Sequence, residues 1–283
     1  MSGIVQLFVR KRISVTMSAY RIFVAIILGG AIALGGLSWL LVVSNEERDE
    51  APALANVATP PVEPAPVLPA EPEPVPVPVL PIRSLIAGVP FIVQAPSANW
   101  SDPVFQDACE EASILMASVW VSGTTLTPRI AEARISALAQ YQVKRFGHSV
   151  DTSIVDTESI IRDFLMVETA EVKRGITATD IREALADERI VIVPTDGRKL
   201  GNPNFRAPGP PRHMLVIVGY DTVKDEFIVN DPGTRKGEGY RYPTAVIMDA
   251  ILDYETGKHA PATSKDKVML MVWRPDGDTL QKE

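Results

Sequence analysis

The chain contains a single cysteine, Cys109, at a position that suits a nucleophile. It lies in the stretch DACEEAS, where the residue pattern predicts a helix over 107–121. With Asp107 as the N-cap and Glu110 three residues later, the start resembles a D-x-x-E capping box. Cys109 then falls in the first helical turn, where free backbone N–H groups and the helix dipole lower the pKa of a thiol. A cysteine taken alone is more often a small buried hydrophobe, so a catalytic interpretation needs partner residues.

Two polar residues further along the chain could provide those partners. A nucleophilic thiol needs a base, and the base needs a group that orients it. His213 begins the apolar run HMLVIVGY, and Asp231 follows the next apolar run in FIVNDPG. In an antiparallel pair the start of one strand lies beside the end of its partner, so the two side chains are expected to meet. Taken singly, they could be a surface histidine and a turn-forming aspartate, and Asn230 is a second choice for the orienting group.

The predicted elements that would position these residues are mainly helices in the first part of the globular region and mainly strands in the second part. Thr127-Pro128 and Thr177, with Asp180 three residues on, mark helix starts. Helices are predicted at 107–121, 127–142, 156–166, 177–187 and 243–254, and strands at 89–93, 190–195, 213–220, 226–230 and 268–273. The segment DTVKD between two strands indicates a hairpin turn. Helices followed by an antiparallel sheet predict an α+β domain.

Four short motifs together resemble a known family. Gln94 in VPFIVQ, Cys109 in DACEEAS, His213 in HMLVIVGYD and Asp231 in VNDPG follow one another in the order of the C39-like branch of papain-fold cysteine peptidases. The resemblance covers about residues 88–235. It implies a papain-like α+β fold, with Cys109 as nucleophile, His213 as general base and acid, and Asp231 as orienting residue. Gln94 and the Cys109 backbone N–H would form the oxyanion hole. No metal or organic cofactor is implied.

The residues after the cysteine depart from the family pattern. Many members have glycine directly after the cysteine, whereas Glu110 and Glu111 follow it here. Two nearby carboxylates oppose thiolate formation, in competition with the helix terminus and a protonated His213. Peptide-bond hydrolysis is the leading hypothesis. A catalytically inactive peptide-binding module, and an amidase or acyl transferase of the same fold, are the alternatives.

An apolar segment near the N-terminus predicts a membrane anchor. Residues 22–43 are uncharged, and about 20 such residues suffice to cross a bilayer as a helix. Basic residues in the short segment 1–21 and an acidic cluster after residue 43 predict a cytoplasmic N-terminus and an extracytoplasmic remainder. A cleaved signal peptide is the alternative, but its apolar region is usually only about 7 to 15 residues long.

A proline-rich segment separates this anchor from the globular part. Eleven of the 24 prolines lie between residues 51 and 82, which favours polyproline II over a packed core. Residues 44–82 are therefore predicted to be a disordered spacer, and 83–283 the peptidase-like domain. A protein that serves chiefly as a membrane-anchored scaffold is a further alternative, with the spacer as its main device.

Charge and composition narrow the class of partner. Beyond residue 43 the chain has 24 cationic side chains against 35 carboxylates, an acidic balance that argues against a nucleic-acid partner. One cysteine and three histidines exclude an internal disulfide framework and make a metal cluster improbable. The expected partners are a peptide or protein substrate and the membrane, and the sequence does not determine an oligomeric state.

A few other residues are weaker candidates for the site. Trp100 could line the cleft beside the cysteine helix, although such a residue is more often a packing anchor. His148 and His259 lie in predicted surface loops. The loop before His213 is basic and could hold an acidic substrate or simply be solvated; its cationic residues are Arg198, Lys199, Arg206 and Arg212.

Overall fold

The computed structural model describes residues 79–257, 259 and 265–275, all within a compact unit that spans 73–283. The predicted anchor at 22–43 and most of the predicted spacer lie outside the described residues. Among the helices in the described ranges, none combines the length and apolar character needed to span a membrane. The fold below therefore concerns the C-terminal unit alone.

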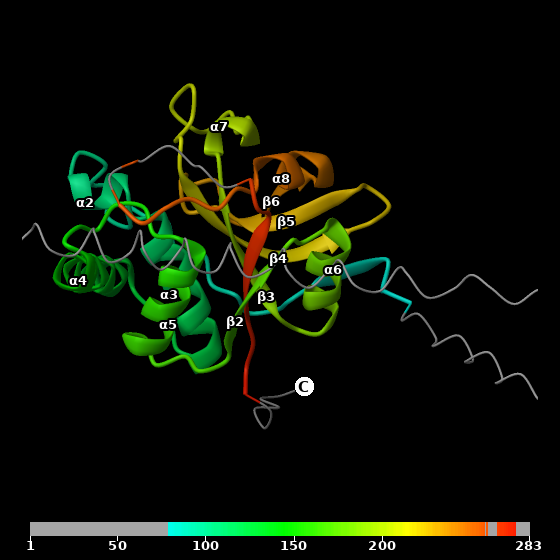
Figure 1. Ribbon diagram of the computed structural model, residues 1–283, viewed down its shortest axis with the longest axis horizontal. Helices are drawn as coiled ribbons and strands as arrows, with labels where there is room; N and C mark the ends of the chain where they lie inside the picture. Colours follow the sequence, from blue (N-terminus) through cyan, green and yellow to red (C-terminus); the bar gives the residue numbers. More distant parts are fainter. Residues whose placement is uncertain (1–78, 258, 260–264, 276–283) are drawn as a thin grey trace, which may run out of the picture. The chain divides into compact units, whose positions relative to one another are not determined.

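The centre of this unit is an antiparallel sheet of seven strands (Figure 1). Its order is β2-β7-β3-β4-β5-β6, and β1 pairs with β4 outside this path. Strands β3, β4 and β7 are buried at every position, so they form the middle of the sheet. The bounds are β1 Arg83–Leu85, β2 Ala170–Arg174, β3 Ile190–Thr195, β4 His213–Asp221, β5 Glu226–Asn230, β6 Tyr240–Pro243 and β7 Val268–Val272.

Helices cover both faces of the sheet, as Figure 1 shows. Successive residues of a strand point to opposite faces, and Met214 and Val216 of β4 pack in one apolar cluster while Leu215 and Ile217 pack in the other. The first cluster holds α3, α4 and α5, and the second holds α6 and α8. The bounds are α2 Pro103–Gln106, α3 Cys109–Ser122, α4 Pro128–Phe146, α5 Ile154–Asp163, α6 Ala178–Ala186, α7 Gly197–Leu200 and α8 Thr244–Ala250.

The predicted α+β class is confirmed, and several elements match their predictions closely. Strands β3 and β5 have the predicted bounds. Thr127 caps α4 through a bond from the Ile130 N–H, and Thr177 with Asp180 forms the predicted capping box of α6. These elements were predictable because their signals are local: caps, first-turn proline and runs of β-branched residues.

Two predicted elements are corrected. Residues 89–93 form no strand, and the nearby strand is β1. Pro90 has no N–H for a ladder, and its carbonyl instead accepts a bond from the Asn230 side chain at 3.2 Å. The helix predicted at 243–254 ends at Ala250, because Ile251 pairs with Thr195 at the end of β3.

Candidate active site

Cys109 is the first residue of α3, as the sequence predicts for a thiol in the first helical turn. The predicted N-cap is wrong, however: Ala108 is the N-cap and makes no side-chain cap bond, while Asp107 ends the short helix α2. The break between α2 and α3 thus falls directly before the cysteine. Its Sγ–H donates to Glu110 Oε2 at 2.9 Å, and Sγ accepts a bond from the Met214 backbone.

His213 and Asp231 form a buried pair at the edge where β4 begins and β5 ends. The antiparallel pairing of β4 with β5 brings these ends together, as predicted. His213 Nε2 and Asp231 Oδ1 are 2.7 Å apart, and the two side chains are 1% and 0% exposed. With Nε2 held by the carboxylate, Nδ1 is the ring nitrogen that can exchange a proton with a thiol or substrate.

The carboxylate of Asp231 is held by further donors. Its Oδ2 accepts bonds from Tyr242 Oη–H at 2.7 Å and Asn202 Nδ2–H at 3.3 Å, and its Oδ1 accepts one from the Gly233 N–H at 3.0 Å. Burial alone would raise the pKa of Asp231, but the charge of His213 and these hydrogen bonds outweigh it and hold the pKa below its usual value. Asp231 is therefore an ionised, fixed partner for the imidazole.

Sequence reasoning missed Asn202 and Tyr242. Asn202 follows α7, Tyr242 lies in β6, and the Asn202 Nδ2–H also donates to Tyr242 Oη at 2.6 Å. The only signal for Tyr242 was its place in a short polar-aromatic strand, YRYP. No predicted element links Asn202 or Tyr242 to Asp231. The three side chains meet only in the folded sheet.

One residue at this site must be glycine. A side chain at Gly233 would approach His213 Cε1 at 2.8 Å and Phe205 Cε1 at 3.0 Å. Phe205 contacts the imidazole edge-on, with ring centroids 5.3 Å apart. The ring of His213 is thus enclosed by Asp231, Phe205 and the backbone at Gly233, which restricts its orientation.

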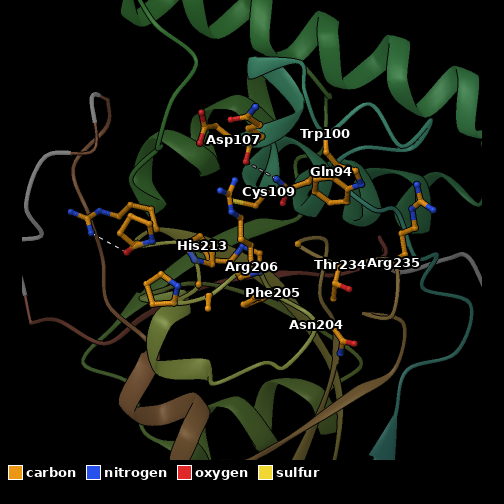
Figure 2. Close-up of a pocket in the computed structure, with 18 of the residues that line it drawn as sticks. Gln94, Trp100, Asp107, Cys109, Asn204, Phe205, Arg206, His213, Thr234 and Arg235 are labelled. Carbon is orange, nitrogen blue, oxygen red and sulfur yellow. Dashed lines mark hydrogen bonds between the residues drawn. The ribbon is translucent and has the colours of Figure 1, made fainter.

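The site contains one cleft of about 830 Å³, shown in Figure 2. Gln94, Trp100, Cys109 and His213 are among the lining residues, and Asp231 lies behind His213. The structure therefore brings together all the residues that the sequence singled out for catalysis. Among the described residues, no cluster of His, Cys, Asp and Glu side chains is arranged to hold a metal ion.

Gln94 is tied to the start of the cysteine helix through α2. Its Nε2 donates to the Phe105 carbonyl at 3.0 Å and to the Gln106 carbonyl at 2.8 Å. Both amide hydrogens are thus engaged, and donating to an oxyanion requires one of these bonds to be exchanged. Trp100 is half-buried and packs against the main apolar cluster while it lines the cleft, so it combines the two roles considered for it.

Two buried carboxylates follow the thiol. Glu110 Oε1 accepts a bond from Tyr254 Oη–H at 2.7 Å, while its Oε2 accepts the thiol proton. Glu111 points elsewhere, with Oε1 accepting from Gln142 Nε2–H at 2.7 Å. Burial raises the pKa of both carboxyl groups, and the charge of Glu110 raises that of Glu111 further.

The electrostatic balance at the thiol favours its neutral form. Burial is the main cause that raises the pKa of Cys109, followed by the charge of Glu110 and the hydrogen bond to it. The Met214 backbone bond acts in the opposite direction but does not compensate. The predicted opposition between the carboxylates and the thiolate is therefore present. The pKa of Cys109 is raised overall, whereas a helix start alone would lower it.

The remaining candidates occupy different places. Asn230 binds the Pro90 carbonyl and the Gly239 N–H, so it does not replace Asp231. His148 packs against Gly257, and His259 lies beside Asp151 with Nδ1 3.0 Å from its Oδ2. Of the four cationic residues in the loop before His213, two are paired outside the cleft and two line it: Arg198 pairs with Asp196, Lys199 pairs with Asp249, and Arg206 and Arg212 line it.

The α+β domain thus places a helix-start cysteine and a histidine paired with a buried aspartate at one cleft. The model of the Peptidase_C39 like family matches residues 86–259, more than half of the chain. The chain therefore belongs to this family.

Comparison with solved structures matches a candidate C39-like peptidase from Bacillus anthracis. The two chains are 15% identical, the match covers 68% of this chain and 98% of the other, and the TM-score is 0.45. Comparison with curated proteins gave no significant match.

Proposed function

We propose that the domain is a cysteine peptidase with a papain-like fold that hydrolyses peptide bonds. The observation that carries the proposal is the buried His213–Asp231 pair, at 2.7 Å, in the wall of the cleft that contains Cys109. A histidine oriented by an ionised carboxylate is the group that a thiol nucleophile needs. Membership of the Peptidase_C39 like family supports the same activity.

The reaction follows from the positions of these groups. His213 Nδ1 takes the thiol proton, and Cys109 Sγ forms a bond to the peptide carbonyl carbon. The resulting oxyanion lies at the start of α3, where the Cys109 backbone N–H can donate to it. Gln94 is the second donor in this proposal, after exchanging one of its bonds to α2.

From this tetrahedral intermediate, hydrolysis proceeds through formation of an acyl-enzyme and then its hydrolysis. The imidazolium of His213 gives its proton to the leaving amine as the C–N bond breaks, which leaves an acyl thioester on Cys109. A water molecule then attacks the thioester with His213 as base. The carboxylic acid product leaves and the thiol regains its proton, so no external reactant other than water is consumed.

A peptide-binding module without catalysis is the second candidate, and a specific observation favours it. The Cys109 thiol donates to Glu110 at 2.9 Å, and burial and this carboxylate raise its pKa. If the thiol never transfers its proton to His213, the cleft binds peptides without cleaving them.

Trapping the acyl-enzyme separates the two candidates. The full-length protein, mixed with a randomised peptide pool and quenched in acid within milliseconds to seconds, is expected to carry an acyl group on Cys109 by peptide-mapping mass spectrometry. The Cys109→Ser variant serves as control and should yield no thioester. Peptide binding without any adduct or cleavage would contradict the peptidase and favour the binding module.

We further propose that residues 22–43 anchor the protein in the membrane and that 44–82 hold the domain outside. Support comes from the uncharged length of 22–43 and the charge asymmetry around it. A membrane-impermeant maleimide applied to intact cells is expected to label Cys109, because the chain has no other thiol. Labelling only after lysis, at equal probe concentration and pH, would contradict the extracytoplasmic placement.

A further inference from the structure

The cleft and the whole chain have opposite charge balances. The chain carries a net charge of −7. The cleft lining contains twice as many permanently cationic side chains as carboxylates: Arg206, Arg212, Arg235 and Lys236 against Asp107 and Asp151. A positively charged cleft in a negatively charged protein attracts anionic ligands selectively.

The two carboxylates of the lining lie near one imidazole, that of His259, which forms ion pairs with them only when it is protonated. His259 Nδ1 is 3.0 Å from Asp151 Oδ2, and His259 Nε2 is 3.9 Å from Asp107 Oδ1. By contrast, within the described part of the chain, neither Arg206 nor Arg235 forms an ion pair with a carboxylate, and both are exposed. The guanidinium groups of Arg206 and Arg235 are therefore available to a ligand.

Arg206 is placed close to the reacting groups by an anchored loop. Its neighbour Phe205 packs on the ring of His213. The loop is fixed by a bond from the Phe205 N–H to the Asn202 carbonyl at 3.1 Å and one from the Gly209 N–H to the Arg206 carbonyl at 2.8 Å. Figure 2 shows Arg206 and His213 among the residues that line the cleft.

Arg235 is carried by a tight turn that starts at Asp231. The Asp231 N–H donates to the Gly237 carbonyl at 2.9 Å, and the Lys236 N–H donates to Thr234 Oγ1 at 3.2 Å. A side chain at Gly237 would overlap the Asp231 carbonyl oxygen, so this turn requires glycine. Asp231, which orients His213, and Arg235 thus belong to the same hydrogen-bonded turn.

We propose that the cleft selects peptides with aspartate or glutamate side chains near the scissile bond, and that Arg206 and Arg235 bind those carboxylates. The inference rests on the proposed peptidase function and names its substrate class. A guanidinium suits this role because its planar N–H groups bind a carboxylate in a bidentate manner. Lys236, which follows Arg235 in the chain, adds a further positive charge to the cleft lining.

A binding experiment tests the preference without requiring turnover. Full-length Cys109→Ala protein is immobilised and offered two pools of randomised decapeptides that differ only in a central Asp or Asn. Mass spectrometry of the retained peptides is expected to show about tenfold more of the Asp pool near 0.1 M salt, with the ratio falling as salt rises. Equal retention of the pools, or none, would overturn the proposal.

Variants assign the preference to the two arginines. Combining Arg206→Gln with Arg235→Gln is expected to bring the Asp-to-Asn ratio close to one. Arg134→Gln is the matched control, because Arg134 is exposed on α4 and does not line the cleft. If the double variant keeps the full ratio, Arg206 and Arg235 are not the binding groups and the proposal fails.

Hydrolysis by the unaltered protein distinguishes failure of this inference from failure of the peptidase proposal. Cleavage of both pools at equal rates would overturn the acidic preference and leave the peptidase standing. Preferential binding of the Asp pool to Cys109→Ala, without any cleavage by the unaltered protein, would overturn the peptidase and support the preference.

Discussion

Replacing His213 with alanine is expected to lower kcat/KM for peptide hydrolysis by about 10³-fold or more. The imidazole lines the cleft that contains Cys109, and the buried carboxylate of Asp231 orients it. Without it the attack step loses the base that passes the thiol proton on, and the leaving amine loses the imidazolium that would protonate it. The measurement is the initial rate of cleavage of a peptide pool under subsaturating conditions.

The ring of His213 is buried, so its loss could also disturb the fold. His213→Gln controls for this, because an amide can still donate to Asp231 but cannot shuttle a proton at neutral pH. His148→Ala removes an imidazole that packs against Gly257 outside the cleft, and it should leave the rate close to that of the unaltered protein. Activity of a folded His213→Gln variant within tenfold of the unaltered protein would refute the assigned role.

The proximity of His213 and Asp231 and the helix-start position of Cys109 were predictable because these residues lie at the ends of strongly patterned elements. His213 opens a strand that is buried over nine residues, and Cys109 opens a helix that ends at a left-handed glycine, Gly123. Hairpin geometry then placed Asp231 beside His213 without further information. The cleft was thus predictable to the extent that its residues lie on neighbouring local elements.

Other features depend on packing that no local pattern encodes. Strand β2 is an edge strand of only five residues, AEVKR, and so short a pattern does not distinguish a strand from a loop. Asn202 and Tyr242 reach Asp231 only when β6 joins β5 and the loop after α7 folds over them. Such long-range contacts require the tertiary fold.

The burial of Glu110 and Glu111 is a further feature that no local pattern encodes. Charged residues are seldom fully buried. Helix α3 instead lies in the interior, with twelve of its fourteen residues buried. The carboxylates therefore influence the thiol at close range and without screening by water.

Replacing Glu110 with glutamine is expected to raise the rate of iodoacetamide alkylation of Cys109 at pH 7 by about tenfold for each unit that the thiol pKa falls. Alkylation requires the thiolate, and the pKa of Cys109 is raised by burial and then by the charge of Glu110 and the bond to it. Removing that charge lowers the pKa, so the curve of rate against pH should move to lower pH. Burial persists in the variant, so part of the elevation should persist as well.

Glu111→Gln is the matched control for this change. Glu111 is an adjacent buried carboxylate, but its side chain binds Gln142 rather than the thiol, and its charge is the weakest of the causes that raise the Cys109 pKa. Its alkylation profile should shift much less than that of Glu110→Gln.

The pH profile of peptidase activity provides a second measurement on Glu110→Gln. Because Glu110 competes with His213 for the thiol proton, the rising limb of this profile should move to lower pH together with the alkylation curve. Coincident alkylation profiles for Glu110→Gln and the unaltered protein would show that Glu110 does not restrain the thiol.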